Sequence, residues 1–127
     1  MKKTNLMCAL LASVTLAACA GGGMKSAPAM MADGVLTGAN GMTLYTFDKD
    51  MAGSGKSMCN GPCATNWPPL FAMDGDMASG EYSIVNRDDG KKQWAFKGKP
   101  LYYWVKDQKP GDKTGEGFNN VWHTAKP

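Results

Sequence analysis

Two cysteines and the one histidine are the side chains of this sequence best suited to chemistry. Cys59 and Cys63 form the segment CNGPC, a C-x-x-x-C pair, and His123 is the only histidine. In an oxidising compartment such a pair is typically a structural disulfide that closes a tight loop. In reduced form, the two thiolates, the imidazole and methionine thioethers would make a soft ligand set suited to Cu(I). The disulfide is the favoured interpretation, and copper is the alternative.

Two segments carry the same aromatic and acidic residues. GMTLYTFDKD, residues 41–50, aligns without a gap with GKPLYYWVKD, residues 98–107, which indicates an internal repeat. The matched functional positions are Tyr45 and Tyr102, Phe47 and Trp104, and Asp50 and Asp107. Strand residues two apart share a face, so each copy has an aromatic pair suited to core packing. The aspartates would accept loop N–H groups, or would converge with the tyrosine hydroxyls near a pseudo-twofold axis to bind a cation or polar ligand.

Common enzyme motifs are missing from the sequence. AGSGKS, residues 52–57, resembles the end of a phosphate-binding loop, but the required first glycine falls at Asp50, whose carboxylate would repel a phosphate. ATP binding is therefore not expected. One histidine without a G-x-S-x-G setting gives no hydrolase, and two thiols with one imidazole are too few for zinc. We expect neither catalytic activity nor a cofactor, apart from the copper alternative.

The elements that would position these residues are mainly β-strands. Apolar residues alternate with period two between frequent turn signals, which predicts a small antiparallel β domain. Asn40-Gly41 and Asp89-Gly90 are expected to turn two hairpins, because these residues tolerate positive φ. The predicted strands are VLTG, MTLYTF, EYSIVN, KQWAFK, LYYWV and VWHTA, with one helical turn at residues 64–67.

The N-terminus has the pattern of an exported lipoprotein. Lys2 and Lys3 precede the apolar run LMCALLASVTLAA, which suits a signal peptide over residues 1–18. The run ends in LAAC, which resembles the bacterial lipobox and predicts that Cys19 is lipidated. Ala20, in place of an aspartate, implies sorting to the outer membrane, facing the periplasm. Residues 19–34 would be a flexible linker, rich in Gly, Ala, Ser, Pro and Met.

The remaining residues, 35–127, are expected to form one domain of two repeats, at about 35–80 and about 81–127. The chain has 14 basic and 11 acidic side chains, and two of the basic ones lie in the predicted signal peptide. The near-neutral balance of the remainder gives no support for a nucleic-acid partner. The membrane would be contacted through the lipid anchor.

Four segments carry a family resemblance: LTGANGMTLYTFDKD, CNGPCATNWPPL, WAFKGKPLYYWVKDQKPGD and NNVWH. Together they resemble predicted bacterial lipoproteins with a Y-x-[FWY]-x-x-D motif, also described as a secreted repeat of unknown function. The resemblance implies an envelope location and this type of fold, and it supplies no activity or catalytic residues. The sequence therefore predicts a cell-envelope lipoprotein that acts as a non-catalytic binding or envelope-associated module. A periplasmic copper-binding or thiol-redox protein using Cys59, Cys63 and His123 is the alternative.

Overall fold

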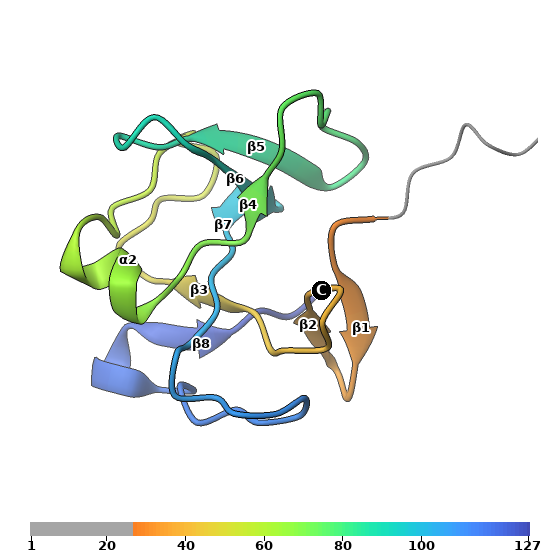
Figure 1. Cartoon of the computed structure of the whole chain (residues 1–127), viewed down its shortest axis with the longest axis vertical. Helices are drawn as coiled ribbons and strands as arrows, with labels where there is room; N and C mark the ends of the chain where they lie inside the picture. Colours follow the sequence, from red (N-terminus) through yellow and green to blue (C-terminus); the bar gives the residue numbers. More distant parts are fainter. Residues whose placement is uncertain (1–26) are drawn as a thin grey trace, which may run out of the picture.

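The computed structural model describes residues 27–127; residues 1–26 are the thin grey trace of Figure 1. The predicted signal peptide, the lipidated Cys19 and the first part of the predicted linker lie outside the described residues. Within the described range, no helix is long and apolar enough to cross a membrane.

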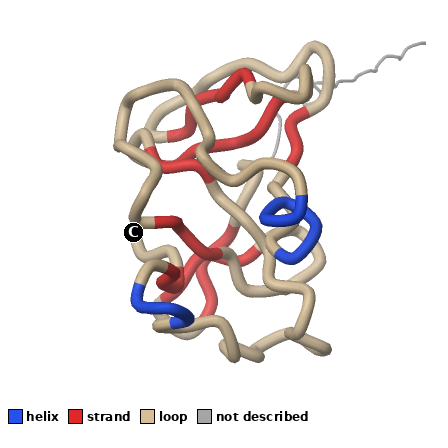
Figure 2. Tube along the Cα trace, turned by 90° about the vertical axis from the view of Figure 1, so that its left-hand side faces the viewer, coloured by secondary structure: helices blue, strands red, loops and turns tan. Residues whose placement is uncertain are grey.

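The described chain is mainly β, as predicted, with short strands joined by long loops (Figure 2). Every strand pairing is antiparallel. The elements are β1 (Met30–Ala32), β2 (Val35–Thr37), β3 (Tyr45–Phe47), α2 (Pro62–Asn66), β4 (Phe71–Ala72), β5 (Tyr82–Asn86), β6 (Lys92–Phe96), β7 (Lys99–Pro100), the 3-10 helix η2 (Phe118–Asn120) and β8 (Trp122–Thr124).

The strands form three small groups. One sheet has the order β4-β6-β5, with β7 also paired to β6; β3 pairs with β8, and β1 pairs with β2. In Figure 1 the β4–β7 sheet lies above the β3–β8 pair, and the β1–β2 hairpin lies to one side. None of these groups is large enough to be stable alone, so the domain depends on how they pack together.

The hairpin of β5 and β6 is turned at Asp89-Gly90, as predicted. The N–H of Arg87 donates to the carbonyl of Lys91 at 2.9 Å, and Gly90 has φ +84°, which a β-branched residue would not adopt. The register pairs Val85 with Gln93.

Two boundaries differ from the prediction. The fold begins before Val35, because Asp33 and Gly34 both have left-handed φ and turn β1 back onto β2, so the linker's last residues belong to the domain. LYYWV is not one continuous strand. It changes partner along its length: Leu101 bonds to the β6 residue Trp94, whereas Tyr102 forms isolated bridges.

The two repeats meet at their motif tyrosines. The N–H of Tyr45 donates to the carbonyl of Tyr102 at 2.7 Å, and the N–H of Tyr102 donates back to the carbonyl of Tyr45 at 3.0 Å. This reciprocal pair is the centre of a pseudo-twofold arrangement, since each tyrosine occupies the same place in its own repeat. The predicted internal repeat is therefore a structural one.

The C-terminal segment of each repeat, its tail, pairs with the motif segment of the other repeat, its front. In β8, at the end of the second repeat, Trp122 is paired with Phe47 of β3. At the end of the first repeat, Pro69 bridges Tyr102, and the N–H of Tyr103 donates to the carbonyl of Pro68 at 2.7 Å. The repeats are thus intertwined, and neither contains all of its own strand partners.

Each half also contains a closed trio of backbone hydrogen bonds. Leu36 donates to Ala125, Ala125 donates to Leu44, and Leu44 donates to Leu36, at 2.8, 2.8 and 2.9 Å. The equivalent trio in the other half is Trp94 to Leu70, Leu70 to Leu101, and Leu101 to Trp94. Both leucines that match between the repeats are fully buried in the aliphatic core. In each trio two residues come from one repeat, and the third, Ala125 or Leu70, comes from the tail of the other repeat.

Candidate functional site

The motif tyrosines and aspartates bind each other across the pseudo-twofold centre. The hydroxyl of Tyr45 donates to Asp107 Oδ2 at 2.7 Å, and the hydroxyl of Tyr102 donates to Asp50 Oδ2 at 2.5 Å. All four residues are buried. Each aspartate therefore serves the tyrosine of the other repeat.

The second oxygen of each aspartate holds the loop that follows it. Asp50 Oδ1 accepts the N–H of Met58 at 2.6 Å, and Asp107 Oδ1 accepts the N–H of Thr114 at 3.0 Å. The structure thus places these carboxylates against loop backbone, and hydrogen-bond donors occupy both of their oxygens. Among residues 27–127, no group of three or more His, Cys, Asp or Glu side chains is arranged to hold a metal ion.

Burial sets the protonation of these motif groups. It raises the pKa of both Tyr45 and Tyr102 well above the ordinary value, and the hydrogen bond to the aspartate raises the pKa of each further. Burial also raises the pKa of Asp50, opposed by the hydrogen bonds from Tyr102 and Met58. The tyrosines consequently stay protonated donors near neutral pH, which suits a structural role.

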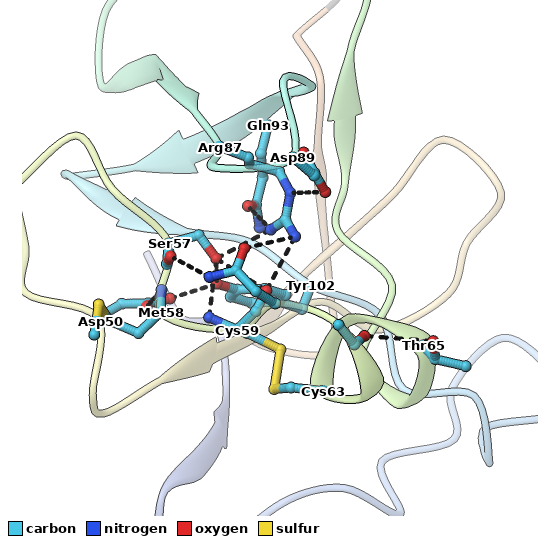
Figure 3. The surroundings of a disulfide bond; sticks show 12 residues. Asp50, Ser57, Met58, Cys59, Cys63, Thr65, Arg87, Asp89, Gln93 and Tyr102 are labelled. Atoms are coloured by element: carbon cyan, nitrogen blue, oxygen red, sulfur yellow. Dashed lines mark hydrogen bonds and ion pairs between the residues drawn. A yellow bond between two sulfur atoms is a disulfide. The ribbon is translucent and has the colours of Figure 1, made fainter.

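A buried arginine supports the first repeat's loop. The side chain of Arg87 is fully buried, and its Nη1 donates to Ser57 Oγ at 3.0 Å and to Gln93 Oε1 at 2.9 Å. Its Nη2 donates to the carbonyl of Cys59 at 3.0 Å, and its Nε contacts Asp89 (Figure 3). Sequence reasoning missed this residue, because an arginine beside an acidic turn is usually solvated.

The disulfide fixes the same loop. Cys59 and Cys63 are joined, as predicted, with Cys63 in the first turn of α2 and Cys59 beside the helix, fully buried (Figure 3). Ser57 contacts both the Tyr102 hydroxyl, at 2.6 Å, and Arg87. The covalent link and the pseudo-twofold centre therefore belong to one connected network.

His123 lies apart from the two cysteines. Its Nε2 is 2.9 Å from Asp48 Oδ2 and its Nδ1 is 3.2 Å from Glu116 Oε2. The hydrogen bonds to Asp48 and Glu116 raise the pKa of His123. The imidazole lines a cavity of about 400 Å³, whereas Cys63 lines a different one of about 370 Å³. The structure does not bring the three predicted copper ligands together.

Four aromatic rings, two from each repeat, form one continuous stack. Phe47 stacks on Trp122 at 4.2 Å between ring centroids, Trp122 on Trp67 at 3.8 Å, and Trp67 on Trp104 at 4.0 Å. Trp67 and Trp122 are equivalent positions of the two repeats and lie almost parallel, 3° apart. These two tryptophans, far apart in the sequence, thus stack on each other, which alignment alone could not show.

A groove of about 370 Å³ opens beside this stack, between α2 and η2. Phe118 in η2 contributes an aromatic side chain that is 40% exposed. Lys49, Asn66 and Asn119 also line the groove, and their side chains have no hydrogen-bond or ion-pair partner within the described part of the chain. Aromatic walls with a few free polar groups are the usual composition of a ligand site.

The backbone of η2 is strained at this groove. Asn119 and Asn120 have φ of +52° and +59°, in the left-handed region that non-glycine residues seldom adopt. Each such residue costs on the order of 1 kcal/mol, and outliers of this kind cluster at binding sites. Sequence reasoning missed this feature; the only signal was the Asn119-Asn120 pair.

Comparison with known proteins gives one family. The model of the family described as a secreted repeat of unknown function matches the chain twice, over residues 29–71 and 83–126. No match is found among curated proteins or solved structures.

Proposed function

The chain belongs to the family of secreted repeats of unknown function, and from this premise we propose that it is a non-catalytic binding module of the bacterial cell envelope. The groove between α2 and η2 is its binding surface. One observation carries the proposal. Three polar side chains that have no partner within residues 27–127 lie beside exposed aromatic surface and next to the Trp67–Trp122 stack: Lys49, Asn66 and Asn119.

The paired motif groups support a binding role over a catalytic one. The side chains of the four motif residues form hydrogen bonds with one another and with the adjacent loops: Tyr45, Tyr102, Asp50 and Asp107. A catalytic carboxylate or phenol would need to reach a substrate within hydrogen-bond distance. The motif instead stabilises the platform on which the groove is built.

The location follows from the family, which is secreted. The finer proposal is a lipid anchor at Cys19 and residence at the outer membrane, facing the periplasm, as the lipobox resemblance indicates. Multiple acyl chains hold a protein firmly at a bilayer. The groove would then meet material of the periplasmic space.

Cosedimentation with isolated bacterial envelope fragments tests the proposed function. The chain is used from Ala20 onward, without the predicted signal peptide and Cys19, so that neither a lipid nor an uncleaved signal can hold it to the fragments. Phe118→Ala removes the exposed groove ring. Phe71→Ala is the matched control, because Phe71 is 45% exposed and does not line the groove.

We expect the parent chain and Phe71→Ala to sediment alike, and Phe118→Ala to require about tenfold more fragments for half-binding. Equal sedimentation of all three chains would assign the binding to another surface. If the parent chain did not sediment, the proposed function would be wrong.

A further inference from the structure

We propose that the groove binds a glycan of N-acetylated pyranose sugars that bears carboxylate groups. The inference rests on the proposed function and names the ligand class of the same site. A second copy of this chain is the other occupant, and the experiment below distinguishes it from a glycan.

The aromatic surface of the groove suits a sugar ring. Phe47 ends the four-ring stack, so that Trp122 covers one of its faces, and Phe47 is only partly buried. Phe118 packs at a tilt against Trp104, with centroids 4.9 Å apart, and keeps part of its surface exposed. The apolar C–H face of a pyranose can cover such rings while its hydroxyl groups point to the rim.

The polar rim suits acetamido and hydroxyl groups. Asn66 lies at the end of α2 and Asn119 lies in η2, both exposed, on the two elements that flank the groove. Each primary amide has two hydrogen-bond donors and one acceptor atom, and neither side chain forms a hydrogen bond within residues 27–127. A peptide strand would need a free sheet edge here, and the groove is lined by helix and loop residues apart from the strand residues Phe47 and Trp122.

The charge of the groove selects an acidic ligand. Lys49 is its one charged lining residue, and no carboxylate lines it within the described residues. The cavity around His123 differs, because Asp48 and Glu116 line it together with lysines. A cation without a partner beside aromatic rings favours a glycan with carboxylates over a neutral one.

The rigidity of the groove supports this choice. The disulfide holds α2, whose residue Cys63 lines the groove. The turn around Asn119 is closed by two backbone hydrogen bonds, Asn120 to Gly117 at 2.9 Å and Val121 to Phe118 at 3.1 Å. A preformed site loses less conformational entropy when it binds, which matters for a ligand with few apolar groups.

The test is a fluorescence and calorimetric titration of the purified chain with three probes of defined chemistry. They are peptide-free peptidoglycan glycan strands, which carry N-acetyl and carboxylate groups; chitotriose in its fully N-acetylated form; and cellotriose, which has neither group. Trp67 and Trp122 line the groove, so their emission reports occupancy.

We expect the carboxylated glycan to bind at least about tenfold more tightly than N-acetylated chitotriose, and cellotriose to bind most weakly. Lys49→Gln should abolish the preference for the carboxylated probe, with Lys92→Gln as an exposed control outside the groove. Asn119→Gly should weaken both N-acetylated probes by about fivefold to tenfold, because it removes the amide and frees the left-handed backbone.

Three results would overturn the inference. Equal affinity for cellotriose and N-acetylated chitotriose would remove the role of the amides. If no probe binds while envelope fragments still bind in a Phe118-dependent way, the ligand class is wrong and the proposed function stands. A concentration-dependent increase in mass, lost in Phe118→Ala, would assign the groove to a second copy of the chain.

Discussion

The loops that follow the motif aspartates of the first and the second repeat begin alike and then diverge. Both donate a backbone hydrogen bond to a motif aspartate, from Met58 in the first and from Thr114 in the second. The first is then fixed by a disulfide and by the buried Arg87. The second is held by Glu116, whose Oε1 accepts from the N–H and the hydroxyl of Thr124 at 2.8 Å.

The difference separates the roles of the two halves. The disulfide and the buried Arg87 hold the first repeat's loop and make it rigid. The second repeat's loop is held by partly exposed polar contacts and carries the exposed Phe118 and the strained Asn119. The first half therefore supplies the rigid side of the groove, with Lys49 and Asn66, and the second half adds the exposed Phe118 and Asn119.

The largest effect should come from the buried Arg87, which belongs to the second repeat and holds the loop of the first. Arg87→Met removes donors from Ser57, Gln93 and the carbonyl of Cys59 and leaves these buried groups without that partner. We expect a loss of about 3–5 kcal/mol in the free energy of unfolding, measured by urea denaturation. Lys91→Met, at an exposed position in the same turn, should change it by less than about 0.5 kcal/mol. Comparable values for both variants would show that the network does not support the fold.

The two motif tyrosines allow the halves to be compared directly. Tyr102→Phe leaves Asp50 with one donor, from Met58, whereas Tyr45→Phe leaves Asp107 with two, both from Thr114. We expect Tyr102→Phe to cost about 2–3 kcal/mol of unfolding free energy and Tyr45→Phe about 1–2 kcal/mol.

Tyr82→Phe is the control for these two variants, since no hydrogen bond of its hydroxyl is described. Its unfolding free energy should stay close to that of the parent. A larger cost for Tyr45→Phe than for Tyr102→Phe would reverse the assignment of the more dependent half.

Removal of the disulfide should have a smaller effect than loss of the arginine. For the Cys59→Ser, Cys63→Ser double variant, the short closed loop predicts a loss of about 2 kcal/mol. Thermal unfolding of the parent in oxidised and reduced form gives the same quantity without a substitution. If reduction leaves the unfolding temperature unchanged, Arg87 alone suffices to hold the loop.

The smallest effect concerns His123 in the second half. The pKa of His123 is raised above 6.5 in the folded state, so its stabilising contribution is complete below pH 6.5 and is lost as the pH rises through the folded pKa. The pKa of Glu116 is lowered below 4.5, so its contribution is present above that pH and is lost as the pH falls through its folded pKa. Both contributions coexist between about pH 4.5 and 6.5.

An NMR titration of the imidazole protons should therefore give a pKa above 6.5 for His123. Because the side chain is 43% exposed, His123→Ala should cost well under 1 kcal/mol at pH 5.5, and less at pH 9. A pKa at or below 6.5, or a cost that grows with pH, would contradict the pairing with Asp48 and Glu116.

The sequence predicted the features that depend on residues close together in the chain, such as turns and the disulfide. The Asp89-Gly90 turn follows from φ preferences, and the helical turn predicted at residues 64–67 is present but lies earlier, at Pro62–Asn66. The alignment of Tyr45 with Tyr102 predicted two copies of one unit. The disulfide followed from the spacing of its cysteines and the inferred export.

The remainder depends on contacts between distant residues. That Asp50 would bind Tyr102, and not the tyrosine of its own repeat, depends on how the two copies approach each other. Arg87 resembles a surface residue until the loop of Cys59 folds over it. The groove forms only when Phe118 and Asn66 are brought together from opposite halves, so its lining could not be listed from sequence.

The exchanged tails have a consequence for how such a fold depends on concentration. A single repeat has a front that pairs with a tail from elsewhere and a tail that pairs with another front. On its own it could complete this arrangement only by meeting a second molecule, so its folded fraction would fall on dilution. Two copies in one chain turn that encounter into an intramolecular step, and the folded state then withstands any dilution.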